Sequence, residues 1–170
     1  MENTIKSIEI ALENELKERD FYLKHRRRTQ TLVGRMMFAS IARDEDEHYI
    51  RLKSIHAELS KQGKWPEAIS AVKGTKVKTV LNDVLKGVEK SASPDADDRE
   101  AVNIAIDFET KGYNFYSKLR DSAETEAEKS FFECLATIEN EHLSSLKETR
   151  LYFEDPATWL EQHEKPHFEG

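Results

Sequence analysis

The sequence repeats itself once, with a constant offset of 94 residues between matching positions. No insertion separates the matches near the start of each half from those further on. The matching pairs are Ile10 and Ile104, Ala11 and Ala105, Glu15 and Glu109, Lys17 and Lys111, Phe21 and Phe115, Tyr22 and Tyr116, Thr31 and Thr125, Phe38 and Phe132, Ala42 and Ala136, Glu45 and Glu139, Glu47 and Glu141, His48 and His142, and Leu52 and Leu146. Because a solenoid needs three or more stackable repeats, two copies predict a closed, pseudo-symmetric bundle.

Each half has the periodicity of two helices joined by a turn. Apolar residues, with a few Glu and His among them, recur at steps of three and four and so share one face of each helix. These faces contain Ile5, Ile8, Leu12, Glu15 and Tyr22; Phe38, Ile41, Glu45, His48, Leu52, Ile55 and Leu59; Val102, Ile106, Glu109, Tyr113 and Tyr116; and Phe132, Leu135, Glu139, His142 and Leu146. Thr125-x-x-Glu128 fits a capping box, and Thr31 is the counterpart of Thr125. We predict helical hairpins over about 3–61 and 95–154.

A long crossover, residues 62–94, joins the two hairpins. Six of its apolar residues have helical spacing: Val77, Val80, Leu81, Val84, Leu85 and Val88. They predict a short amphipathic helix inside the crossover. A connection of this length can carry the chain back along the bundle before the second hairpin begins. Asp155-Pro156 ends the last helix, so we predict a four-helix bundle over 1–154 and a C-terminal tail over 155–170.

The composition agrees with an all-α fold and excludes several classes of protein. Charged residues make up 35% of the chain while Gly and Pro are scarce, which favours long solvated helices over sheets. The single Cys134 excludes an internal disulfide and any Cys-x-x-Cys module. No apolar stretch is long enough to span a membrane, so we expect a soluble, cytoplasmic protein with no membrane partner. A net charge of −7 argues against nucleic acid as a partner.

Two Glu-x-x-His motifs occupy the apolar faces of predicted helices, each with a further glutamate 30 residues upstream. The six residues are Glu15, Glu45 and His48 in the first half and Glu109, Glu139 and His142 in the second. Residues three apart on a helix point the same way, so each motif presents its Glu and His together. An unpaired carboxylate is costly to bury, and four of them on apolar faces therefore need partners.

The spacing places all six side chains at one level of the bundle. The midpoint between Glu15 and Glu45 falls beside the predicted turn before Thr31, and the midpoint between Glu109 and Glu139 falls at the equivalent place. In an antiparallel hairpin, residues equidistant from the turn lie at the same height, here about 22 Å from it at 1.5 Å per residue. Two hairpins that face one another therefore bring four Glu and two His together.

This ligand set suits two divalent metal ions. Four carboxylates carry four negative charges, which two divalent ions cancel, and carboxylate with imidazole suits iron or manganese. Without metal, four clustered carboxylates repel one another, and some must take up protons. The alternative is a buried polar network that holds no metal. A Glu from each of two helices with Glu-x-x-His from each of the others is the arrangement of ferritin-like di-iron and di-manganese proteins.

Residues 1–154 resemble the rubrerythrin-type branch of the ferritin-like superfamily. The resemblance rests on Ile41-Ala42-Arg43-Asp44-Glu45-Asp46-Glu47-His48 and Leu135-Ala136-Thr137-Ile138-Glu139-Asn140-Glu141-His142, and on a tyrosine seven residues after each upstream glutamate. It implies an all-α, ferritin-like four-helix bundle that binds two iron ions, with manganese possible. Glu45 and Glu139 are then the bridging ligands, Glu15 and Glu109 the terminal ones, and the two histidines bind separate ions.

The tyrosines and one further glutamate have roles that depend on this resemblance. Tyr22 and Tyr116 are expected to donate hydrogen bonds to ligand carboxylates, although ordinary core aromatics would have the same spacing. Rubrerythrins carry an extra Glu three residues after the third-helix ligand. In this sequence the ligand position is Glu109, and Gly112 stands where the extra Glu would be. Its counterpart in the first helix is Glu18, which either supplies a displaced version of that ligand or is a solvated helix residue.

The expected function is a di-iron oxidoreductase that reduces hydrogen peroxide or dioxygen. Rubrerythrins proper carry a rubredoxin domain with paired Cys-x-x-Cys motifs, which this sequence lacks, so we expect an external electron donor such as a rubredoxin or a flavoprotein. We also expect a homodimer. The alternatives are a ferroxidase with an iron-handling role, like that of ferritins, and a metal-stabilised interaction module without turnover.

Overall fold

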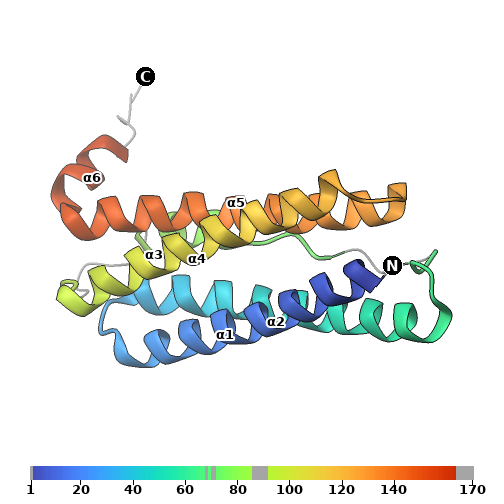
Figure 1. Cartoon of the computed structure of the whole chain (residues 1–170). Helices are drawn as coiled ribbons and strands as arrows, with labels where there is room; N and C mark the ends of the chain where they lie inside the picture. Colours follow the sequence, from blue (N-terminus) through green and yellow to red (C-terminus); the bar gives the residue numbers. More distant parts are fainter. Residues whose placement is uncertain (1, 68, 70–71, 86–91, 164–170) are drawn as a thin grey trace, which may run out of the picture.

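Six helices make up most of the computed structural model, which describes residues 2–67, 69, 72–85 and 92–163. They are α1 (Glu2–Arg28), α2 (Leu32–Gln62), α3 (Val77–Leu85), α4 (Ala96–Asp121), α5 (Glu126–Glu154) and α6 (Pro156–His163). The four long helices, α1, α2, α4 and α5, form a bundle (Figure 1). The predicted all-α bundle of two hairpins, with a short helix in the crossover, is confirmed.

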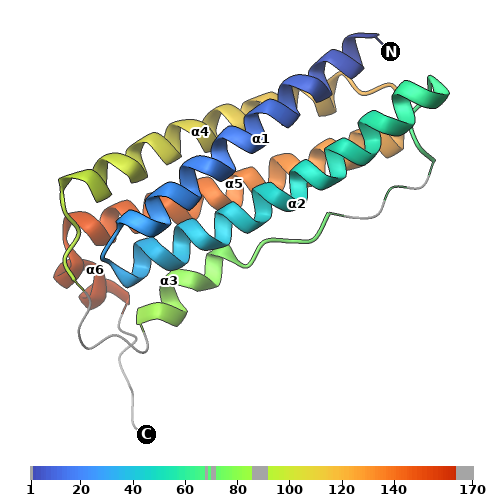
Figure 2. The ribbon, with the colours of Figure 1, turned by 90° about the horizontal axis from the view of Figure 1, so that it is seen from below.

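The crossover determines how the two hairpins face each other. After α2 the chain returns along the bundle to α3, so that α4 starts at the end of the bundle where α1 meets α2 (Figure 2). As a result α1 and α4 are antiparallel, and each long helix packs most closely against its own hairpin partner. Parts of the predicted crossover and tail, residues 68, 70–71, 86–91 and 164–170, lie outside the described residues, and Val88 is among them.

Side-chain caps start three of the long helices. Thr31 accepts a hydrogen bond from the amide of Gly34 at 3.0 Å, and Thr125 accepts one from Glu128 at 3.2 Å. The Glu128 carboxylate bonds the amide of Glu124 and not that of Thr125, so only half of the predicted capping box forms. The complete capping box lies instead at the start of α4, between Asp95 and Asp98. Such caps satisfy amides that have no partner within the helix.

Arg28, the last residue of α1, ties the two hairpins together at one end of the bundle. Its guanidinium contacts three acidic residues around the first turn of α4: Asp95, Asp97 and Asp98. The shortest contact, 2.7 Å, is to Asp98, whose side chain is only 2% exposed. The basic end of one helix and the acidic start of the next thus pair directly, which also suits both helix dipoles.

Two apolar clusters fill the bundle, one on each side of a polar layer. The first cluster surrounds Phe38 and Ile41 near the α1–α2 turn, and the second surrounds Leu52 and Phe132 towards the other end. Between them in the sequence of α2 lie Glu45 and His48, which belong to neither cluster. Close-packed side chains therefore cover the polar layer from above and below.

The C-terminal tail contains a helix, α6, that the sequence interpretation did not foresee. Asp155 follows the last residue of α5 and precedes the first residue of α6. Its side chain accepts a hydrogen bond from the amide of Thr158 and so caps α6. Trp159 anchors this helix: its indole NH donates to Glu148 at 3.1 Å, and its ring meets Tyr152 edge-on at 5.8 Å. The Trp159 ring also stacks on His163, with 3.8 Å between the ring centroids.

None of the helices in the described part of the chain is both long enough and apolar enough to cross a membrane.

Replacing Trp159 by Ala should lower the free energy of unfolding by roughly 3 kcal/mol, because it removes a large side chain that is 6% exposed and leaves a void against α5. The metal content should not change, since α6 packs at one end of the bundle (Figure 1). Chemical denaturation of the purified variant measures the first effect. Leu160→Ala, at a 37% exposed neighbour, is the control and should have little effect. Equal stability of both variants would show that α6 is not docked.

Candidate metal centre

The structure brings all six predicted side chains together in the polar layer. Every one of them is at most 3% exposed. They form two overlapping groups, in each of which the possible ligand atoms lie within 4.8 Å of one another. The first group is Glu15, Glu45, Glu139 and His48, and the second is Glu45, Glu109, Glu139 and His142. Each helix of the bundle contributes at least one member, as the equal spacing from the two turns requires.

Glu45 and Glu139 belong to both groups and lie between the two histidines. The Oε2 atom of Glu45 is 3.2 Å from Nδ1 of His48, and its Oε1 atom is 3.3 Å from Nδ1 of His142. The Oε1 atom of Glu139 is 3.4 Å from Nδ1 of His48. Because the two oxygens of Glu45 face two different imidazoles, this carboxylate could contact two ions if two were bound.

Glu15 and Glu109 each belong to one group and are held by a tyrosine from the other hairpin. Tyr116 donates a hydrogen bond to Oε1 of Glu15, and Tyr22 donates one to Oε1 of Glu109. Their remaining oxygens, Oε2, lie 3.2 Å and 3.3 Å from Nδ1 of His48 and His142. Each tyrosine therefore fixes one oxygen and turns the other into the cluster.

The charges in this layer perturb one another strongly. Burial and then the charge of Glu45 raise the pKa of Glu15 to about 8. Burial and the charges of Glu45 and Glu109 raise the pKa of Glu139 well above its usual value. Burial alone would raise the pKa of Glu45, but its contacts with His142 and His48 outweigh this and lower it. Without cations, the layer thus keeps some protons that exposed carboxyl groups would lose.

The donor set fits a metal centre. Both oxygens of Glu139 and Oε1 of Glu45 are buried, and none of the three accepts a well-aligned hydrogen bond in the described part of the chain, although an imidazole nitrogen lies 3.3 to 3.4 Å from two of them. A buried carboxylate oxygen without a donor is costly, and a bound cation would supply the missing interaction. Carboxylate oxygens with imidazole nitrogens suit iron and manganese. The six residues can therefore hold metal.

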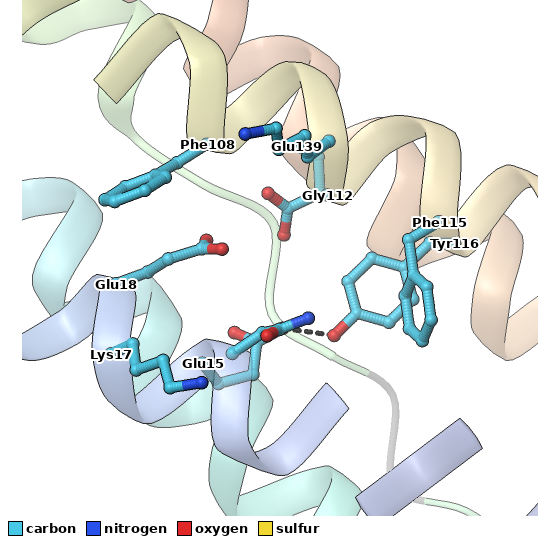
Figure 3. A pocket seen from close by; sticks show the side chains of 10 residues that line it. Glu15, Lys17, Glu18, Phe108, Gly112, Phe115, Tyr116 and Glu139 are labelled. Carbon is cyan, nitrogen blue, oxygen red and sulfur yellow. Dashed lines mark hydrogen bonds between the residues drawn. The ribbon is translucent and has the colours of Figure 1, made fainter. Parts of the chain in front are cut away.

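A pocket of about 300 Å³ reaches this layer from the surface between α1 and α4 (Figure 3). Its walls include Glu15 and Glu139 from the cluster, Tyr116, and the partly buried Glu18, which points into it opposite Gly112. A Cβ atom at position 112 would lie 2.9 Å from Oε2 of Glu139. Glycine at this position therefore leaves room for the Glu139 carboxylate.

Sequence reasoning missed Asp44, whose Oδ2 atom lies 3.1 Å from Nε2 of His142. It also missed Thr75, whose hydroxyl donates to the same carboxylate oxygen from two residues before the crossover helix. The available signal was that Asp44 has no acidic counterpart in the second half, where the matching residue is Ile138.

The family model described as Rubrerythrin matches residues 6–150, which is well over half of the chain. No curated protein and no solved structure matches the chain. The chain belongs to the rubrerythrin family, and the resemblance inferred from the two Glu-x-x-His motifs is confirmed.

The thermal stability of the metal-free protein should fall as the pH rises from about 5 to 9. The raised pKa values of Glu15, Glu139, His48 and His142 mean that the folded state holds protons the unfolded state has already released, so each rise in pH in this window disfavours folding. Metal binding competes with these protons and strengthens as they leave. Melting curves with and without iron(II) or manganese(II) should therefore diverge with pH. Parallel curves would contradict a layer whose charges need a cation.

Gly112→Ala should weaken metal binding while leaving the fold intact. The new methyl group would push against the Glu139 carboxylate. Ala is favoured over Gly inside a helix by about 1 kcal/mol, so the metal-free variant should unfold no more easily than the parent. Titration calorimetry and denaturation separate the two effects. Gly74→Ala is the matched control, because nothing lies within 4 Å of a Cβ atom there. An unchanged metal affinity in Gly112→Ala would contradict the assignment of Glu139 as a metal ligand.

Proposed function

We propose that the chain, as a member of the rubrerythrin family, is a di-iron oxidoreductase that reduces hydrogen peroxide or dioxygen with electrons from an external donor. One observation carries the proposal: a surface pocket ends at two carboxylates of a buried cluster of four Glu and two His. Two iron ions held there would supply the two electrons that reduction of one peroxide molecule to two waters requires.

The protein's own residues hold, orient and enclose the ions in this proposal. Glu45 and Glu139 would contact both ions, because each belongs to both groups of possible ligands. Glu15 with His48, and Glu109 with His142, would complete the two positions. Tyr116 and Tyr22 keep the terminal carboxylates turned inward, and burial raises the pKa of both phenols so that they remain donors.

The pocket suits a small, uncharged oxidant. Phe108 and Phe115 form part of its walls, while Lys17 and Lys111 lie at its exposed rim. A passage between aromatic rings admits peroxide or dioxygen and limits the entry of bulky molecules. The Glu18 carboxyl group lies on the wall opposite Gly112 (Figure 3) and would act as the additional carboxylate that this helix position lacks.

The electrons are proposed to come from outside these 170 residues. Peroxide reduction consumes the two electrons of a reduced di-iron centre, so each further turnover needs a new pair. Cys134 is the single cysteine, and no Cys-x-x-Cys pair exists in the sequence to hold a second iron centre. A small rubredoxin or a flavoprotein would supply the electrons.

Reduced, iron-loaded protein mixed anaerobically with hydrogen peroxide should be oxidised by one equivalent of peroxide and should cycle only when a reduced donor is added. Stopped-flow absorbance follows the oxidation. Glu18→Ala should slow it while two ions remain bound, whereas Glu13→Ala, which removes an exposed carboxylate from the same helix, should not. No oxidation within minutes would overturn the proposal. Continued uptake and mineralisation of iron(II) with oxidant alone would favour a ferroxidase.

A further inference from the structure

The two histidines of the cluster differ in what their outer ring nitrogens contact. Nε2 of His142 lies 3.1 Å from Oδ2 of Asp44, which is 14% exposed. Nε2 of His48 is buried and has no hydrogen-bond partner among the described residues. Both rings direct Nδ1 to the carboxylates of the cluster. The two histidines therefore have the same kind of contact at Nδ1 but different surroundings at Nε2.

The difference follows from a break in the internal repeat. Asp44 lies just before Glu45 in α2, but the corresponding residue of α5 is Ile138, which is 3% exposed and packs in an apolar cluster. The repeat therefore gives two copies of each candidate ligand, but it gives only one copy of the acceptor, Asp44, that contacts the outer nitrogen of a histidine.

Asp44 is itself held by the crossover. The Thr75 hydroxyl donates to Oδ2 of Asp44 and accepts a hydrogen bond from the amide of Val77 at 3.1 Å, at the first residue of α3. One residue later, Lys78 pairs with Glu141 of α5 at 2.7 Å. The His142 side of the cluster is thus supported by α2, α3 and α5 together.

An acceptor on the outer nitrogen changes how well a histidine binds metal. A histidine that binds through Nδ1 carries its proton on Nε2, and an acceptor there fixes this tautomer, holds the ring in place and increases the basicity of Nδ1. Loss of such a partner typically costs about 10- to 100-fold in metal affinity. His142 has this support and His48 does not.

We infer that the two metal positions are unequal: the position of Glu45, Glu109, Glu139 and His142 fills first, and the position of Glu15, Glu45, Glu139 and His48 fills second and exchanges its ion more readily. Asp44 is the positioning residue that sets this order. The inference rests on the proposed two-metal site.

The pocket agrees with this order. Of the six candidate ligands, Glu15 and Glu139 line it. Glu139 belongs to both groups, but Glu15 belongs only to the group that contains His48. The second position therefore lies nearer the route by which ions and oxidants enter, while the first lies deeper, against the crossover. An ion or an oxidant that enters through the pocket would reach the weaker position first.

Calorimetric titration of the metal-free, 170-residue protein with manganese(II) tests the inference without any turnover. The parent should show two steps whose affinities differ by about 10- to 100-fold. Asp44→Ala should lower the affinity of the tighter step by a similar factor and leave the weaker step unchanged, so that the two steps merge. Asp44→Asn keeps an acceptor oxygen and should lie between the parent and the Ala variant.

Asp46→Asn is the matched control, because it removes one carboxylate charge only two residues from Asp44. The Asp46 side chain pairs with Arg19, outside the cluster. The control variant should leave both steps as they are. Two ions bound in one indistinguishable step, or an equal loss in both steps in Asp44→Ala, would overturn the unequal positions while leaving the two-metal site in place. Failure of the parent to bind two ions would instead overturn the proposed di-iron function.

Discussion

Four carboxylates in one buried layer repel one another, and the rest of the bundle is arranged around that repulsion. Two histidines and two tyrosines offset part of it, and the orphaned oxygens of Glu139 and Glu45 mark the part that remains for cations. The apolar clusters on either side exclude water, which makes the unbalanced charge more costly and a bound cation more stabilising. Stability and metal binding therefore depend on the same layer.

The parts of the structure that the sequence revealed are those determined by local helix geometry. A 94-residue repeat with a 30-residue spacing inside each copy defines two hairpins and puts Glu15 and Glu45 at one height, because the rise per residue is constant. The spacing of Glu45 and His48 likewise defines their shared direction. The fold class and the meeting of the six side chains needed no knowledge of how the helices pack.

The features that the sequence did not reveal depend on contacts between helices. The spacing of Tyr22 and Glu15 suggested a role near the cluster, but Tyr22 bonds Glu109 of the opposite hairpin, which only the packing of α1 against α4 decides. Asp44 and Thr75 meet because of the path of the crossover. The sequence showed that position 112 lacks a carboxylate, but not that Glu139 fills the space beside it.

The repeat preserves the six candidate ligands but not all of the residues around them. A symmetric set of six residues suits two similar ions, whereas Asp44 opposite Ile138 and Glu18 opposite Gly112 give each half different surroundings. Asp44 supports the side against the crossover, and Glu18 lies on the side of the pocket. Because Glu45 and Glu139 are shared by both groups of possible ligands, a change on either side would alter the surroundings of both proposed ions. In the proposed di-iron function, such an arrangement would anchor one ion while its neighbour faces the oxidant.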